Sequence, residues 1–222
     1  MCGRFAMPWD PDELADRLGA DADESVKEIT PSYNIAPGAT IAVIRRTAVG
    51  RSLLTGARWN LIPSWSPTDR LAYPTFNARV ETAADRAAFR DAAYSGRILI
   101  PMLGYYEWDA HHNPHWFHAR DGRILLAAGL LSTWHGTPTC TILTRATEDR
   151  CALIHDRMPV LIPSGRTRPW LDPGADARGV LHDADRTGGH ATRLLDSHPV
   201  APLHGDGPEL TEPAPPAQGR LF

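Results

Sequence analysis

The sequence contains one lysine, three cysteines and no long apolar run, and each shortage excludes a class of protein. Cysteines at positions 2, 140 and 151 are too few for a disulfide scaffold and fit a reducing compartment. No stretch approaches the roughly 20 apolar residues of a transmembrane helix. Arg4 and Pro8 interrupt the first ten residues, which therefore lack the apolar core of a secretion signal. We expect an intracellular, cytoplasmic protein with no membrane partner.

An excess of positive charge is also missing. The formal net charge is −3 over 222 residues, so the chain as a whole is not attracted to nucleic-acid phosphates. A local basic groove is still compatible with this charge. Almost all of the positive charge is arginine, which suits forked phosphate contacts but is also favoured by a GC-rich genome. Nucleic-acid binding must therefore be argued from local motifs.

The pattern of helices and strands predicts one α+β domain over residues 2–204. Residues 10–13, Asp-Pro-Asp-Glu, have the features of a helix start, and Gly19 can end that helix. A second helix is expected over residues 82–94. Short apolar runs typical of strands occur at 40–44, 97–101, 124–130, 139–144 and 158–162. Strands outnumber helices and do not alternate with them, so we expect a curled, mostly antiparallel, barrel-like sheet with flanking helices.

Two further segments bear on partners and metals. Residues 205–222 are rich in proline and acidic side chains, which predicts a disordered C-terminal tail. The histidine-rich residues 111–118 contain the turn signal Asn113-Pro114, and we interpret them as a surface hairpin. No CxxC pair is present. We expect neither a metal site nor a cofactor.

Cys2 is the candidate nucleophile. A cysteine is small enough at this position for an aminopeptidase to remove Met1, which would leave an α-amine and a thiol on one residue. Their ordinary pKa values, about 8 and about 8.5, make both partly available as nucleophiles at neutral pH. The amine can condense with an aldehyde, and the thiol can then close a five-membered thiazolidine ring. On the dipeptide alone, a cysteine that merely follows the initiator methionine remains an alternative.

The surrounding motifs favour the chemical interpretation. They are, in chain order, CGRF at 2–5, YNIAP at 33–37, WNLIPSW at 59–65, NARVET at 77–82, GYYEW at 104–108 and HDRMPV at 155–160. Over roughly residues 2–172 this series resembles the SRAP family, the SOS response-associated peptidase or abasic-site processing proteins. The chain departs from the family pattern at Asn60, at Tyr105 and at Met102-Leu103. None of these departures removes a catalytic group.

The resemblance implies an abasic-site processing enzyme of the DNA-damage (SOS) response. It would bind single-stranded DNA and form a covalent thiazolidine crosslink between Cys2 and the ring-opened aldehyde, with removal of Met1 as an associated autopeptidase activity. We accordingly expect a monomer that is associated with the nucleoid on DNA damage.

Three further residues are candidates for catalysis. His155 can donate and accept protons near neutral pH. Glu107 lies in an aromatic run, where a carboxylate is costly to bury unless it is paired or protonated, and it can take a proton from the Cys2 amine. Asn77 can donate and accept at once, and the resemblance places it at the hydroxyl of the opened sugar.

Arginine and tryptophan residues in the motifs predict the DNA contacts. Arg4, Arg79 and Arg157 would form a local phosphate-binding groove. Trp65, and Trp59 with it, can stack against bases beside the lesion without sequence preference.

Two other functions remain open at this point. Glutamine amidotransferases also begin Met-Cys-Gly, and in such N-terminal-nucleophile amidohydrolases the amine acts as base for its own thiol. They usually continue with an aliphatic stretch, whereas this chain has Arg4-Phe5. The other alternative is a single-strand binder with no covalent chemistry.

The end of the chain suggests a second partner. Gln218, Leu221 and Phe222 resemble the short peptide by which bacterial repair proteins bind the replication sliding clamp. A proline-rich tether would present the two apolar side chains to a hydrophobic pocket.

Overall fold

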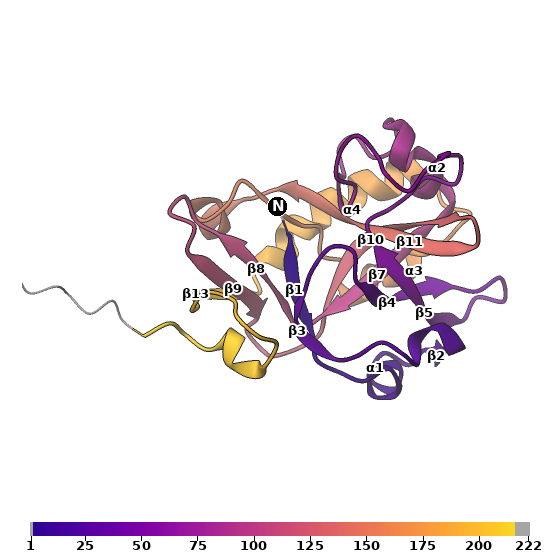
Figure 1. Cartoon of the computed structure of the whole chain (residues 1–222). Helices are drawn as coiled ribbons and strands as arrows, with labels where there is room; N and C mark the ends of the chain where they lie inside the picture. Colours follow the sequence, from indigo (N-terminus) through magenta and orange to yellow (C-terminus); the bar gives the residue numbers. More distant parts are fainter. Residues whose placement is uncertain (1, 216–222) are drawn as a thin grey trace, which may run out of the picture.

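The computed structural model describes residues 2–215, apart from the side chains of residues 149 and 150, and a closed barrel lies at its centre (Figure 1). Neighbouring barrel strands are antiparallel, and β5 then pairs in parallel with β11 to close the ring. In ring order the strands are β11 (Thr137–Ala146), β10 (Leu125–Trp134), β7 (Arg97–Met102), β4 (Thr40–Arg46) and β5 (Ser52–Trp59). Closure pairs strand edges that would otherwise be exposed. The predicted α+β class with a curled, mostly antiparallel sheet is confirmed.

A second, antiparallel sheet carries the N-terminal segment. Its order is β13 (Leu195–Pro199), β9 (Pro114–Ala119), β8 (Gly104–Trp108), β1 (Arg4–Met7) and β3 (Ser32–Ile35). Strand β1 pairs with β8 on one side and with β3 on the other, so that Phe5 lies opposite both Tyr105 and Ile35. Pairing on both edges fixes β1, which begins two residues after Cys2.

Two short strands flank the end of β11. On one edge β6 (Asn77–Arg79) runs parallel to β11, and on the other β12 (Arg157–Pro159) runs antiparallel to it. Thr144 of β11 lies opposite Arg79 and also opposite Pro159. Two motifs almost 80 residues apart in the sequence are therefore brought together across one strand. A further short strand, β2 (Asp21–Ala22), pairs with β5.

Helices cover the outside of the sheets. They are α1 (Pro11–Leu18), α2 (Ala87–Ser95), α3 (Thr167–Trp170) and α4 (Ala177–Thr192), with 3-10 turns η1 (Glu24–Val26), η2 (Asp149–Leu153), η3 (Ser164–Arg166) and η4 (Pro208–Thr211). The prediction of α1 is confirmed: the Asp10 carboxylate accepts a hydrogen bond from the Glu13 amide, and Gly19 ends the helix with φ 59°. The second helix was predicted to start too early. The Thr82 backbone carbonyl oxygen accepts hydrogen bonds from the amides of Asp85 and Arg86, which closes a turn. Helix α2 begins only after this turn, at Ala87.

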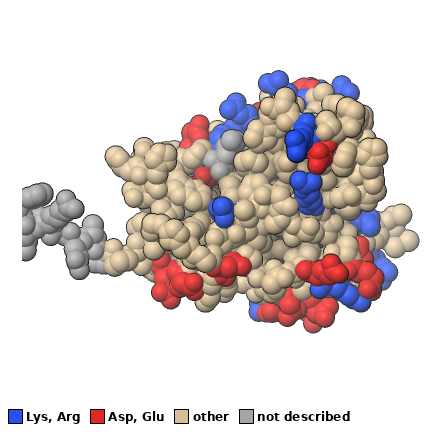
Figure 2. Space-filling view, in the orientation of Figure 1, with Lys and Arg blue, Asp and Glu red and all other residues tan. Residues whose placement is uncertain are grey.

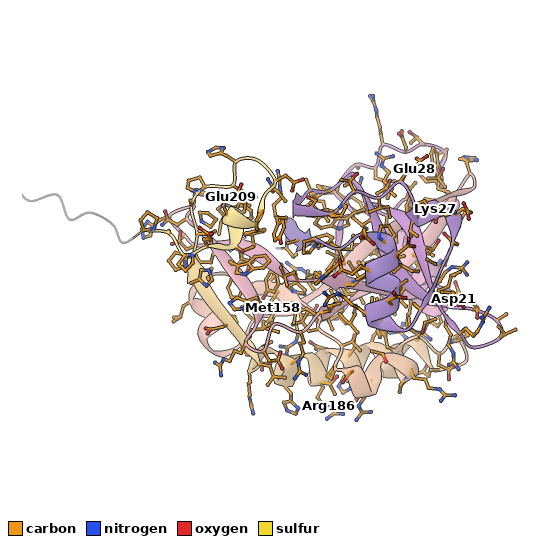
Figure 3. All side chains as sticks on the ribbon, turned by 90° about the horizontal axis from the view of Figure 1, so that it is seen from below. Asp21, Lys27, Glu28, Met158, Arg186 and Glu209 are labelled. Atoms are coloured by element: carbon orange, nitrogen blue, oxygen red, sulfur yellow. The ribbon has the colours of Figure 1, made fainter. Side chains whose placement is uncertain are left out.

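Helix α4 was not predicted. Three glycines, at positions 179, 188 and 189, lower its helix propensity by roughly 1 kcal/mol each. The structure gives a reason for one of them, since a Cβ at Gly189 would lie 3.0 Å from the Glu148 carboxylate and 3.3 Å from the Arg145 guanidinium. Figure 3, with Arg186 on α4 and Met158 labelled, shows this helix along the lower side of the molecule.

The prediction of a disordered tail from Gly205 is wrong for residues 205–215. Leu210 in η4 is buried in a small cluster with Val200 and Tyr106, and Pro213 forms an isolated bridge with Val200. A prediction from composition does not find this ordered structure, because only a few specific contacts hold the polar segment in place. Gln218, Leu221 and Phe222 lie outside the described residues.

Other predictions concern the hairpin and membrane insertion. Strands β8 and β9 form the expected hairpin, with an exposed turn at residues 110–113, but β9 is an internal strand of the second sheet whose Trp116 and Phe117 are buried, so the prediction of a surface segment is wrong for residues 114–117. Within residues 2–215, no three His, Cys, Asp or Glu side chains are grouped so that they could hold a metal ion. The helices in the same range are too short or too polar to span a bilayer.

Candidate functional site

Cys2 is anchored by a residue from a distant strand. It lies two residues before the start of β1 and has no exposed surface. The Asn77 side-chain amide donates a hydrogen bond of 2.7 Å to the Cys2 carbonyl oxygen. Within the described part of the chain, the buried Asn77 Oδ1 has no hydrogen-bond partner, although such an atom normally has one. Asn77 therefore holds the backbone of Cys2 and keeps an acceptor available for another molecule.

Glu107 supplies a titratable carboxyl near Cys2. It lies on β8, the neighbour of β1, with only 2% of its surface exposed. Burial raises the pKa of this carboxyl to about 7, and the negative charge of Asp156 contributes in the same direction. Glu107 can therefore gain or lose a proton near neutral pH, as a general acid or base must.

The Cys2 thiol is held in its protonated form. Burial raises the thiol pKa well above its ordinary value, and the charge of Glu107 raises it further. The thiol is thus not a standing thiolate at neutral pH, and its attack on a carbon atom needs a base to receive the proton. Glu107 is close enough to act on that thiol electrostatically.

His155 lies between η2 and β12 with 29% of its side chain exposed. Burial lowers its pKa, although the charge of Asp156 opposes this change. Its Nδ1 lies 2.9 Å from the Arg157 amide nitrogen and 2.9 Å from the Asp156 carboxylate. In the neutral ring, Nδ1 accepts from the amide and the proton lies on Nε2. In the charged ring, Nδ1–H would instead donate to Asp156.

The three candidate arginines differ in their surroundings. Arg79 on β6 is exposed. Arg157 forms a two-pronged ion pair with Glu81, at 2.7 and 2.9 Å, and donates to the Thr144 carbonyl oxygen. Arg4 Nη1 donates a 2.9 Å hydrogen bond to Asn34 Oδ1. The Arg157 guanidinium therefore links β12 to β11 and to Glu81.

The two candidate tryptophans separate into one exposed and one buried residue. Trp65 is 55% exposed, as stacking on a base would require. Trp59 has no exposed surface: it packs on Phe5 and Phe76, and its indole N–H donates to the Phe76 carbonyl oxygen. The prediction that Trp59 contacts bases is wrong, because this last residue of a barrel strand lies in the core.

Asn60, a departure from the family pattern, fastens the loop that carries Trp65. Its side-chain oxygen accepts from the Thr75 amide at 3.1 Å and from the Thr75 hydroxyl at 3.0 Å. Sequence reasoning assigned no role to this pair, nor to Glu81 or Asn34. Three of the four lie inside the quoted motifs, but only the structure shows which side chain each one contacts.

Charge is unevenly distributed on the face shown in Figure 2. Acidic side chains gather along its lower edge, while basic side chains are spread over its centre and upper part. Strand β1 begins in the central part of the same view (Figure 1). The net charge of −3 therefore does not describe the surface around this site.

Comparisons with known proteins show the family and the fold of the chain. A family model described as SOS response associated peptidase (SRAP) matches residues 1–203. The abasic site processing protein YoqW of Bacillus subtilis (strain 168) is 33% identical over 227 residues, which cover 96% of this chain and 99% of the relative. YoaM of the same organism, also named an abasic site processing protein, is 34% identical over 182 residues, 78% of this chain and 80% of the relative. A crystal structure of a protein from Bacteroides thetaiotaomicron has the same fold, with a TM-score of 0.81 at 20% identity over 96% of this chain and 100% of that one.

Proposed function

Because this chain belongs to the SOS response associated peptidase (SRAP) family, we propose that it captures abasic sites in single-stranded DNA through a covalent bond to Cys2. The names of the relatives support the class of substrate. The observation that carries the proposal is the convergence of Cys2, Asn77 and Glu107, with a buried amide oxygen available and a carboxyl that titrates near neutrality.

The proposed reaction needs three changes at the sugar carbon C1′. Opening of the sugar ring moves a proton from the C1′ hydroxyl to the ring oxygen and yields an aldehyde. The α-amine of Cys2, freed when Met1 is removed, attacks C1′, and loss of one water gives an imine. The thiol sulfur then adds to C1′ while its proton passes to the former imine nitrogen. The product is a thiazolidine, and the sum is aldehyde plus aminothiol giving thiazolidine plus water.

Each pocket residue has a role in these steps. Glu107 accepts a proton from the Cys2 ammonium and relays the thiol proton, which burial would otherwise hold in place. His155 presents Nε2–H to the ring oxygen in its neutral form and supplies a proton in its charged form. Asn77 Oδ1 accepts from a hydroxyl of the opened sugar.

A denaturing gel tests the proposal. The mature protein is mixed with a labelled single-stranded oligonucleotide that contains one abasic site, heated with detergent, and separated by electrophoresis. We expect a shifted band with the abasic strand and none with the intact strand. Ammonia release from glutamine without such a band would instead support the amidohydrolase alternative.

Arg79→Ala tests the phosphate groove. This exposed arginine on β6 follows Asn77 by two residues, so we place it on the DNA backbone. Its loss should weaken binding to abasic and intact strands alike and reduce the slope of log affinity against log salt by about 0.7, the value of one phosphate contact on a single strand. Fluorescence anisotropy at four salt concentrations measures both. Loss confined to the abasic strand would place Arg79 on the lesion instead.

The C-terminal peptide provides a separate prediction. We propose that Gln218, Leu221 and Phe222 bind the sliding clamp, with the two apolar side chains in a hydrophobic pocket. Burying each large side chain is worth about 1.5–3 kcal/mol, less the cost of ordering the peptide. Deletion of residues 218–222 should abolish co-elution with the clamp and leave the crosslinking rate unchanged. A crosslinking rate that falls with the deletion would argue against a tether role.

A further inference from the structure

Residues 205–215, here called the C-terminal strap, lie beyond the matched range of the family model, which ends at residue 203. They pack against β3 and β13 on the side of the second sheet (Figure 1). Figure 3, with Glu209 labelled, shows the strap at one end of the molecule. The proposed crosslinking chemistry gives this segment no role. Its contacts with the rest of the protein therefore need a reason of their own.

The strap is tied down at both of its ends. Near its start, Asp206 accepts hydrogen bonds from the Ser32 hydroxyl at 2.6 Å and from the Tyr33 amide at 2.9 Å. Near its end, the Ala214 amide donates to the Pro199 carbonyl oxygen at 2.8 Å. Between these points, the buried Leu210 packs in the small cluster that includes Tyr106. The strap is therefore a packed part of the fold with one charged contact to β3.

From β3 the contacts continue to the DNA site. Asn34 donates through Nδ2 to the Gly205 carbonyl oxygen at 2.9 Å, and its Oδ1 accepts from Arg4 at 2.9 Å. The first contact orients the Asn34 amide, since Nδ2 faces the strap and Oδ1 must then face Arg4. The Asn34 backbone amide is held in turn by the Ser32 hydroxyl. A continuous series of hydrogen bonds thus runs from the strap to the Arg4 guanidinium.

We propose that the C-terminal strap positions Arg4 for a DNA phosphate by fixing Asn34, an inference that rests on the proposed function. An arginine has many rotamers, and ordering it during binding costs affinity. With the strap in place, the Arg4 side chain is already ordered in the free protein, so DNA binding does not have to supply that cost. Asp206 and Asn34 are positioning residues, because they act through Arg4 and do not contact the reacting atoms.

Asp206→Ala is the direct test, and Glu212→Ala is its matched control. Both variants remove one exposed carboxylate from the strap, but only Asp206 contacts β3, and no hydrogen bond or ion pair of the Glu212 side chain occurs among residues 2–215. Asp206→Ala should raise the Kd for intact single-stranded DNA roughly two- to tenfold, as expected when one side chain must be ordered on binding. The crosslinking rate at saturating abasic DNA should stay within twofold of wild type. Glu212→Ala should change neither quantity.

A double-mutant cycle separates positioning from general loosening of the fold. In an Arg4→Ala background, Asp206→Ala should have no further effect on Kd, because the residue through which it acts is gone. Additive losses, or an unchanged Kd in Asp206→Ala, would overturn the inference. If Asp206→Ala unfolds, Ser32→Ala takes its place in the cycle, since it removes one strap contact together with the hydrogen bond from the Asn34 amide. A wild-type chain that binds no single-stranded DNA would contradict the proposed function itself, whichever way the strap variants behave.

Discussion

Cys2→Ala is expected to reduce the denaturation-resistant adduct with abasic single-stranded DNA from the wild-type level to background. The alanine variant can still offer an α-amine, but the imine it forms has no neighbouring thiol to close a ring, and water reverses it. Cys2→Ser should likewise lose the stable adduct and keep a transient imine. Borohydride added during the reaction would reduce that imine to a stable amine. The Cys2→Ser variant should therefore give a shifted band on the denaturing gel when borohydride is present and none when it is absent.

The matched control for this result is Cys151→Ala. Cys151 lies in η2 and is partly exposed, whereas Cys140 is buried. Cys151 lies outside the proposed chemistry, and its replacement should leave the amount of adduct unchanged. A full adduct in Cys2→Ala, or loss of adduct only in Cys151→Ala, would show that the wrong thiol had been chosen.

The second large effect is expected at the two proton-transfer residues. His155→Ala and Glu107→Gln should each slow capture by about 10²–10⁴-fold, the usual contribution of a general acid or base. Single-turnover time courses on denaturing gels measure these rates, with intact-strand affinity as a check on binding. His111→Ala, in the exposed turn after β8, is the control for a lost imidazole. Wild-type rates in both pocket variants would mean that the pocket is wrongly assigned.

Glu107 also predicts how the rate changes with pH. Burial raises its pKa to about 7, so that in the chain that still carries Met1 the carboxyl is largely protonated below this pH and ionised above it. Because the base is the ionised form, capture should accelerate as the pH rises through the pKa of Glu107. An N-terminal ammonium lowers that pKa against the effect of burial, and the ammonium of a mature Cys2 would act in the same direction. In Glu107→Gln this inflection should disappear, while any inflection from His155 should remain.

Local sequence signals were sufficient where short-range interactions decide the structure. Helix α1 follows from the Asp10 cap and Gly19, which act within one turn of the chain. Four of the five barrel strands follow from apolar runs, whereas β5 (Ser52–Trp59) was not predicted. Helix α4 could not be found in this way, because its three glycines lower helix propensity, and the close contact of Gly189 with Arg145 and Glu148, about 40 residues earlier in the chain, is visible only in the structure.

For the site, the motifs supplied the residue types and the fold supplied their partners. Cys2, Asn77, Glu107 and His155 were selected by chemistry and resemblance, and no periodicity predicts that Asn77 holds the Cys2 carbonyl. Trp59 illustrates one limit of prediction from sequence: a tryptophan that can stack on a base is equally suited to a barrel core, and the residue type does not distinguish the two. The strap illustrates another: Asp206 and Leu210 stand in a polar, proline-rich segment, but Asp206 contacts Ser32 and Leu210 packs with Tyr106, and both of these partners lie more than 100 residues earlier in the chain.

The most direct test of the covalent chemistry is the mass of the adduct. Wild-type protein incubated with an abasic oligonucleotide should give a species equal to the chain without Met1 plus the oligonucleotide minus one water. An imine has the same mass, so the adduct is also treated with iodoacetamide under denaturing conditions and digested. We expect the DNA remnant on the peptide that begins at Cys2, and we expect no alkylation of the Cys2 thiol. A remnant on any other residue, a retained Met1, or an alkylated Cys2 within the adduct would contradict it.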